Sequence, residues 1–339
     1  MKLMKTQDAV GQVLCHDITQ IIKGVTKDAV FRKGHVITEE DIPVLLSVGK
    51  DNVYIWEKGE KKLHENEAAE ILREMCQGKY MHPTPVKEGK IELVADIDGL
   101  LKVNSDKIKK VNSMGEMMIA SRHGNFAVKK GDKLAGTRII PLVIEKEKME
   151  SAKAVCEGQT ILSLKPFVHK KVGIVTTGNE VYYHRIEDTF TPVIKEKLAD
   201  YDTEVIGQVV CNDDHEKITK AILSLIEKGA DLVLCTGGMS VDPDDKTPLA
   251  IKNTGAKIVS YGAPVLPGAM FLLSYYNEDI PIVGLPGCVM YAKRTIFDLA
   301  LPRIMADDKI TAEELAELGE GGLCLNCSVC TFPNCGFGK

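Results

Sequence analysis

Three glycine-bearing loops in the second half of the chain carry polar residues suited to chemistry. They are residues 176–180 (TTGNE), 236–240 (TGGMS) and 284–287 (GLPG), and each follows a short apolar run. Glycine lets the backbone approach a ligand closely, and amide groups in such loops favour anions. The hydroxyls of Thr177 and Ser240 add hydrogen-bond donors. These residue types predict a site for a phosphorylated ligand.

Carboxylates stand among these loops and indicate a metal ion beside the anion. Glu180, Asp213, Asp242, Asp244 and Asp245 would repel a bare phosphate unless Mg²⁺ bridged the two through oxygen ligands. Each loop alone is also explained by a tight turn, and Asp213 or Asp245 by a helix N-cap. Taken together at one edge of a sheet, the loops favour an anion-plus-metal site.

The C-terminal segment LCLNCSVCTFPNCGFGK holds four cysteines: Cys324, Cys327, Cys330 and Cys335. Four thiolates satisfy a metal's ligand count, and the three closely spaced cysteines are typical of an iron–sulfur site. Structural zinc more often uses two separated CxxC pairs, and free or redox-active thiols are a further alternative. The spacing predicts a metal site in a reducing compartment, holding a 4Fe-4S cluster or Zn²⁺.

The elements that must position the three loops follow a regular pattern over residues 170–304. Short β-branched runs alternate there with longer amphipathic ones, which predicts a three-layer α/β/α domain with a mainly parallel sheet. In such a sheet the loops that follow strands lie together at the carboxyl edge, where ligands bind. The three loops should therefore meet.

The first 165 residues are less regular and predict smaller α+β and β-rich units. Asp98-Gly99, between two apolar runs, predicts a tight hairpin, and residues 107–122 (KIKKVNSMGEMMIASR) predict a helix. We expect four parts: an N-terminal α+β unit (1–85), a β-rich accessory unit (86–165), the α/β domain (166–308) and a cysteine-rich tail (309–339).

Composition excludes several classes of protein. The 339 residues carry a formal net charge of -5, which argues against a nucleic-acid surface. The start has no apolar stretch of signal-peptide length, and no run of 18 apolar residues occurs, so we expect a cytoplasmic protein without membrane contact. The histidines show no HExxH spacing, and neither a Ser-His-Asp pattern nor GxGxxG is present.

The motifs together resemble the molybdopterin-binding domain shared by molybdopterin molybdenumtransferases and the smaller Mog-like proteins. The match runs in order through TTGNE, Asp213-Asp214, TGGMSV with Asp245, Pro267-Gly268 and GLPG. The resemblance implies binding of molybdopterin by its phosphate or adenylate end. For the transferases it also implies a homodimer that uses Mg²⁺ to exchange the adenylate for molybdate, and that serves molybdenum or tungsten enzymes.

The resemblance also implies roles for individual residues. Glu180, Asp213 and Asp245 match the family's acidic residues, and are the candidates for catalysis with Mg²⁺. The candidates for holding the pterin or its phosphate are Thr177, Gly178, Asn179, Asp188, Gly237, Gly238, Ser240, Pro286 and Gly287.

Four family elements are altered or missing, and one of them is the DSN segment after the first loop, which appears only as Asp188-Thr189-Phe190. The lysine-rich KPGKP reads LPGAM from Leu266, so both lysines are absent; GLPGNP reads GLPGCV; and DGYA does not occur. Charge-assisted contacts are worth roughly 1.5–3 kcal/mol each, so losing two cations weakens an oxyanion site. The sequence therefore supports pterin binding more firmly than metal insertion.

Two kinds of function follow. The first is molybdopterin or adenylate binding in molybdenum cofactor biosynthesis, extending to magnesium-dependent molybdenum insertion if the protein is an enzyme. The second is a non-catalytic carrier or sensor of pterin or nucleotide, with the tail as its metal site.

Overall fold

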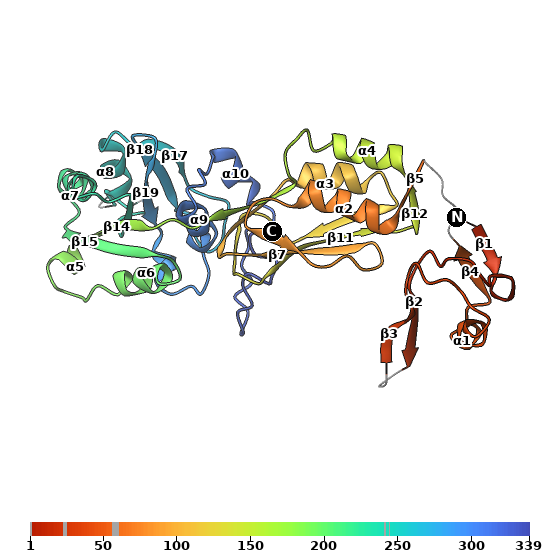
Figure 1. The fold of residues 1–339 in the computed structure, drawn as a ribbon. Helices are drawn as coiled ribbons and strands as arrows, with labels where there is room; N and C mark the ends of the chain where they lie inside the picture. Colours follow the sequence, from red (N-terminus) through yellow and green to blue (C-terminus); the bar gives the residue numbers. More distant parts are fainter. Residues whose placement is uncertain (1, 23–25, 56–60, 241, 244) are drawn as a thin grey trace. The chain divides into compact units, whose positions relative to one another are not determined.

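The computed structural model describes every residue except 1, 23–25, 56–60, 241 and 244. It divides into two compact units (Figure 1). Unit 1 comprises Met1–Ile97, Val103–Arg122 and Lys130–Ser163, and unit 2 comprises Asp98–Lys102, His123–Lys129 and Leu164–Lys339. None of the described helices is long and apolar enough to cross a membrane.

Unit 2 is built on a six-stranded sheet with the order β15-β14-β16-β19-β18-β17. Its central strands pair in parallel and β18 runs antiparallel to both of its neighbours. The mainly parallel α/β fold that the sequence predicts is therefore confirmed. The strands are β14 (Lys170–Thr177), β15 (Thr203–Cys211), β16 (Leu232–Thr236), β17 (Lys257–Tyr261), β18 (Leu272–Tyr276) and β19 (Ile280–Leu285).

Two separate hydrophobic cores cover the two faces of this sheet, which gives the domain three layers. On one face, α7 (His215–Glu227) and α8 (Thr247–Asn253) pack on apolar side chains such as Val175 and Val233. On the other face, α6 (Phe190–Leu198) and α9 (Ile296–Met305) pack on their strand neighbours. Unit 2 also contains the short helices α5 (Asn179–Tyr182), η2 (Gly287–Met290) and α10 (Ala312–Glu317).

Unit 1 contains a four-stranded antiparallel sheet in the order β6-β7-β11-β9. The helices α2 (Glu65–Cys76) and α3 (Ser105–Asn112) contact it, and α4 (Lys146–Ala154) packs on α2. The strands are β6 (Met81–Pro83), β7 (Lys90–Ala95), β9 (Met117–Ser121) and β11 (Lys133–Ile139), with β5 (Lys62–His64) pairing β12 (Val143–Glu145).

The first residues of unit 1 have their own small core, formed by Leu14, Ile18, Ile37, Leu45 and Val53 among others. Its elements are β1 (Lys2–Lys5), which pairs with β4 (Asn52–Ile55), η1 (Thr6–Asp8), the hairpin of β2 (Ile18–Ile22) and β3 (Thr26–Phe31), and α1 (Asp41–Ser47).

The prediction of a tight hairpin at Asp98-Gly99 is wrong. The strand before it, β7, belongs to the four-stranded sheet, whereas β8 (Gly99–Val103) lies between β10 (Phe126–Val128) and β13 (Leu162–Pro166) in a separate sheet. A Cβ at Gly99 would lie 2.5 Å from the carbonyl oxygen of Lys165. Glycine is needed here for the close approach of two backbones rather than for a turn.

The helix expected over residues 107–122 is only half right. Helix α3 ends at Asn112, the chain turns through Gly115 and Glu116 at positive φ (72° and 62°), and Met117–Ser121 forms β9. Met117 and Ile119 are buried while Met118 between them is less so. This period of two belongs to a strand and not to a helix.

Candidate functional site

The three glycine-bearing loops begin side by side at the carboxyl edge of the sheet. Thr176 at the end of β14 is paired with Thr236 at the end of β16, and Thr236 is paired with Leu285 at the end of β19. Because all three strands end at the same level, the loops that follow them start together, as the sequence predicts.

Hydroxyl groups fasten the first two loops to each other. Thr177 is buried, and its Oγ1 donates to the carbonyl oxygen of Thr236 (3.0 Å) and lies 3.0 Å from Oγ1 of Thr247. The Thr247 hydroxyl in turn donates to the carbonyl oxygen of Gly237 (2.9 Å). Thr177, expected as a donor to the ligand, thus supports the loop.

The glycine pair of the second loop is required by the space available. Gly237 and Gly238 have φ angles of +82° and +56°. A Cβ at Gly237 would lie 2.1 Å from the carbonyl oxygen of Thr177, and one at Gly238 would lie 2.9 Å from Oγ1 of Thr247. Only glycine places the loop backbone this close to its neighbour.

Asp213 connects the loop after β15 to the one after β14. Its Oδ2 accepts a hydrogen bond from the amide of Asn179 (2.9 Å), and the amide of Gly178 donates to the carbonyl oxygen of Cys211 (3.2 Å). The N-cap of α7 is Asp214, whose Oδ1 accepts from the amide of Glu216 (2.9 Å). The capping explanation therefore applies to Asp214 and not to Asp213.

Glu180 is exposed at the start of α5, and its carboxylate lies against Gly178. A Cβ at Gly178, where φ is +133°, would stand 2.8 Å from Oε1 of Glu180. The carboxylate therefore lies over the first glycine-bearing loop. A cation bound by one of its oxygens would lie close to the backbone of that loop.

Asp245 stabilises a turn of the second loop. Its Oδ2 accepts from the amide of Asp242 (3.2 Å), and its own amide donates to the carbonyl oxygen of Asp242 (2.9 Å). The N-cap of α8 is Lys246, so the capping explanation fails for Asp245 as well. Ser240 is exposed, and Asp244 lies outside the described residues.

Both carboxylate oxygens of Asp188 accept hydrogen bonds from other residues of the domain. Oδ1 accepts from the amides of Phe190 (2.9 Å) and Thr191 (3.1 Å), and Oδ2 accepts from the Thr191 hydroxyl (2.6 Å) and from Nε2 of Gln208 (2.8 Å). Burial raises the pKa of Asp188, but the hydrogen bonds from Thr191 and Phe190 outweigh it and lower the pKa. Its contacts make Asp188 a structural residue at the start of α6.

The third loop leaves room beside its glycine. Pro286 is buried, Gly287 is exposed, and a Cβ at Gly287 would meet nothing within 4 Å. The first two loops pack tightly against each other, whereas the third is open on the side where a Cβ of residue 287 would project.

The loops fit a polar ligand better than a preformed metal site. Within the described ranges, Oγ1 of Thr236 and Oδ1 of Asn212 are buried without a hydrogen-bond partner. In the same part of the chain, no three acidic, histidine or cysteine side chains gather closely enough to hold a metal ion. Mg²⁺ commonly binds through one or two carboxylates plus phosphate oxygens, so a phosphorylated ligand would have to complete its site.

The loop after β17, where the lysines are absent, is joined to the cysteine-rich tail. The amide of Leu266 donates to the carbonyl oxygen of Gly322, and the amide of Cys324 donates to the carbonyl oxygen of Leu266, both at 2.8 Å. Leu266 also forms a parallel bridge with Leu323. The tail therefore extends from the same edge of unit 2 as the glycine-bearing loops.

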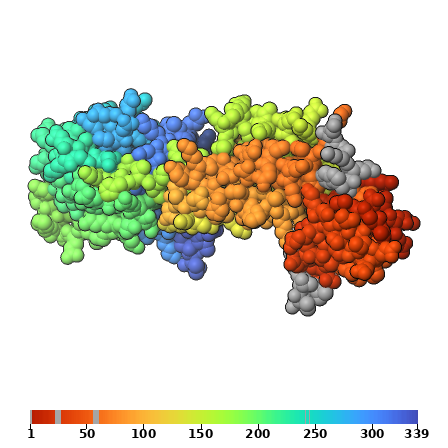
Figure 2. Space-filling view, viewed as in Figure 1, coloured from red at the N-terminus to blue at the C-terminus, as the bar shows by residue number. Residues whose placement is uncertain are grey.

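All four tail cysteines are free thiols and line one cavity of ≈ 190 Å³ together with Lys293 and Arg294. The exposed loop of residues 325–331 projects from the surface of the unit (Figure 2). Nζ of Lys293 donates to the carbonyl oxygen of Ser328 (3.0 Å), and the Arg294 guanidinium lies 4.9 Å from the centre of the Phe332 ring.

The environment of Cys330 favours its thiolate. A hydrogen bond from the amide of Phe332, followed by the hydrogen bond and charge of Arg294, lowers the pKa of Cys330. Lys293 and Arg294 were not among the residues singled out in the sequence, because their nearness to the cysteines depends on the fold. Their only signal was a basic pair just after GLPG.

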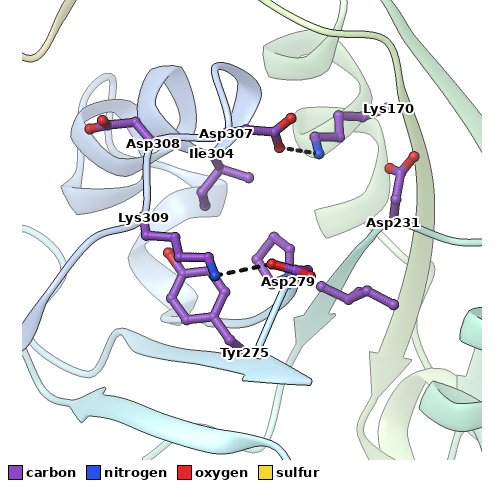
Figure 3. A pocket seen from close by; sticks show the side chains of 10 residues that line it. Lys170, Asp231, Tyr275, Asp279, Ile304, Asp307, Asp308 and Lys309 are labelled. Carbon is purple, nitrogen blue, oxygen red and sulfur yellow. Dashed lines mark hydrogen bonds and ion pairs between the residues drawn. The ribbon is translucent and has the colours of Figure 1, made fainter. Parts of the chain in front are cut away.

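A second cavity of ≈ 400 Å³ lies at the opposite, amino edge of the sheet (Figure 3). Its lysines are paired: Lys170 with Asp307 (2.6 Å) and Lys309 with Asp279 (3.0 Å). Asp231 contributes a buried Oδ1 without a partner among the described residues, and burial raises the pKa of Asp231. None of the predicted site residues lines this cavity, so it is separate from the three loops.

Known families match two parts of the chain. Residues 173–306 match a family described as a probable molybdopterin binding domain, and residues 3–57 match a domain of unknown function. CinA-like proteins of Mycobacterium avium (strain 104) and Mycobacterium tuberculosis (strain H37Rv) are each 32% identical over 80 residues. Those residues are 24% of this chain and 18% and 19% of the relatives, so the match spans under a fifth of their length.

Solved structures resemble part of the chain. The molybdopterin biosynthesis enzyme MoaB of Thermus thermophilus is 24% identical with a TM-score of 0.34, and covers 40% of this chain and 91% of its own. The protein CinA of Thermoplasma acidophilum is 20% identical with a TM-score of 0.33, covering 40% and 98%. The family match coincides with the α/β domain that carries the three loops. Residues 173–306 thus carry a match to a probable molybdopterin binding domain, and the family relationship is shown for that part of the chain.

Proposed function

We propose that unit 2 binds molybdopterin or its adenylate in molybdenum cofactor biosynthesis. The observation that carries the proposal is the meeting of three loops at one sheet edge, two of them locked together through Gly237 and Thr177. The backbone of the glycine pair and the hydroxyl of Ser240 would hold the phosphate. The open side at Gly287 leaves room for the rest of the ligand.

Removing the Ser240 hydroxyl is expected to weaken binding of adenylylated molybdopterin by roughly five- to tenfold, since one hydrogen bond is worth about 1 kcal/mol. Calorimetric titration of the anaerobically purified full chain measures this for Ser240→Ala. Ser224→Ala is the matched control, because Ser224 donates only to the carbonyl oxygen of Ala221 within α7. Absence of pterin binding by the unaltered protein would end the proposal, and equal affinity for plain nucleotides would make it a nucleotide-binding domain instead.

We propose further that Glu180, Asp213 and Asp245 serve Mg²⁺ bound to the ligand's phosphate. Asp213 and Glu180 both adjoin the loop after β14. Because the cation would share its ligands with the phosphate, Mg²⁺ should tighten binding of the adenylate, and Glu180→Gln should remove most of that gain while leaving magnesium-free affinity unchanged. Titrations with and without Mg²⁺ test this. If Mg²⁺ still tightens binding of the adenylate in both Glu180→Gln and Asp245→Asn, these carboxylates do not serve the cation.

A turnover experiment with molybdate distinguishes molybdenum insertion from simple binding and transport of the ligand. If the domain is a molybdopterin molybdenumtransferase, molybdate should release the adenylate from bound ligand. If it is a carrier or sensor, ligand binds and molybdate changes nothing. The loop after β17 favours the carrier, since Leu266 and Ala269 stand where cations would hold an oxyanion and Leu266 is joined to the tail. Chromatography of the adenylate released in a single turnover decides between them.

A further inference from the structure

The cysteine-rich tail is a folded part of unit 2 and is fixed at both of its ends. The amide of Gly338 donates to the carbonyl oxygen of Gly321 (2.9 Å), which closes the segment into a loop. Phe337 is buried in the core that includes α9, and its ring lies 6.1 Å from that of Phe332. Near the start of the loop that this bond closes, Leu323 bridges Leu266. The cysteines are therefore presented from a closed loop with anchored ends.

The four thiols line one cavity of ≈ 190 Å³, which has room for a group larger than a single ion. Leu323, Leu325 and Phe337 also line the cavity, and an apolar lining suits a group held by sulfur ligands.

The charge around the cavity is opposite to that of bound thiolates. Lys293 and Arg294 line it, and none of the described residues that line it is acidic. The Arg294 guanidinium is held by Asp298, with Nη1 at 2.9 Å from Oδ1, and Lys293 is held by tail carbonyl oxygens. Both cations are thus fixed beside the thiols, where they would offset the net negative charge of a four-thiolate centre.

We propose that Cys324, Cys327, Cys330 and Cys335 ligate a 4Fe-4S cluster with Arg294 and Lys293 as its positively charged neighbours. Each thiol releases its proton as it binds iron. Cys324 and Cys335 are partly buried near the anchored ends, whereas Cys327 and Cys330 are exposed. In the described structure the thiols line the cavity without standing at metal-ligand spacing. The exposed part of the loop closes over the cluster when it forms.

This cluster would lie beside two of the loops at the carboxyl edge of the sheet. The tail is bonded to Leu266 in the loop after β17, and to Lys293, which follows the loop after β19. The inference goes beyond the proposed pterin function and does not depend on it, because it rests on the tail, its cavity and its cations alone.

The test is anaerobic reconstitution of the full chain with ferrous iron and sulfide, followed by assays of iron, sulfide and zinc. We expect about four irons and four sulfides per chain, with the broad visible absorption of a cluster that bleaches on reduction. The double variant Cys327→Ser/Cys330→Ser should lose most of the iron, and it should stay folded because both side chains are exposed. Cys156→Ser, whose thiol is buried in unit 1, should keep the full complement.

Stoichiometric zinc without iron in protein purified anaerobically would overturn the proposal, as would a full cluster in the double variant. Arg294→Gln tests the positively charged neighbour by spectroscopic titration of the cluster. Removing the cation should lower the reduction potential, since a positive group stabilises the more negative reduced state. An unchanged potential would remove Arg294 from the proposed environment.

Discussion

Gly237→Ala is expected to lower the free energy of unfolding of unit 2 by about 2–5 kcal/mol. An alanine in the left-handed backbone region costs roughly 1–2 kcal/mol, and forcing an extra methyl group into a packed site costs typically 1–3 kcal/mol. Both costs apply, because φ is +82° and the new Cβ would collide with the carbonyl oxygen of Thr177. Denaturant unfolding of the full chain, followed through the transition of unit 2, measures the loss.

Gly229→Ala is the matched control for this substitution. Gly229 has a similar φ of +94°, but a Cβ there would meet nothing within 4 Å. It should therefore show only the backbone cost, and the difference between the two variants isolates the contact between the loops. Equal losses would mean that the loop after β16 is not held against the loop after β14. Gly237→Ala should also weaken pterin binding, whereas Gly229→Ala should not.

Asp308→Asn is expected to destabilise unit 2 by about 3–5 kcal/mol, the range for breaking a buried ion pair on one side. The carboxylate is nearly buried and meets three cations: Lys102 (2.8 Å), Lys165 (2.6 Å) and Nε of Arg303 (2.6 Å). Arg303 is itself buried, so its charge would be left without this partner. Asp279→Asn is the control, because Asp279 and Lys309 are both largely exposed, and such pairs contribute about 1 kcal/mol or less.

The same carboxylate predicts a pH dependence. Burial raises the pKa of Asp308, but hydrogen bonds from Lys102 and Lys165 and the charge of Arg303 outweigh it and lower the pKa to about 2 from 3.8. Its stabilising effect is therefore present above pH 3.8 and is lost as the pH falls towards 2, amounting to about 2 kcal/mol. The stability difference between the unaltered protein and Asp308→Asn should shrink across that interval. A constant difference would contradict the ion-pair account.

The arrangement of the loops could be predicted because it follows from chain order alone. Runs such as Leu232–Thr236 end in glycine loops, and parallel strands bring those loops to one edge. Strand β18 was not predicted, because the turn that separates its apolar run from the next one contains no glycine or proline. The two are separated by Asn277 and Glu278, which take positive φ angles of 47° and 67° without a glycine. This hairpin sets the antiparallel part of the sheet.

The roles of single side chains could not be read from the sequence. Thr177 looks like a ligand donor until Thr247, seventy residues later along the chain, is placed beside its hydroxyl. Asp213 and Asp214 are neighbours of the same type, and the backbone conformation of Asp214 decides which of them caps α7. Such assignments depend on tertiary contacts rather than on residue type.

The backbone hydrogen bonds between Leu266 and the tail join two segments that are distant in the sequence, the loop after β17 and the chain around Leu323, so that they separate together. The Leu266 and Cys324 amides are held in the same bridge, so neither can exchange its hydrogen with solvent until the two segments separate. One opening equilibrium therefore governs both amides. Any molecule that binds only the closed form, whether on the sheet-edge loop or on the tail, slows exchange at both amides by the same factor.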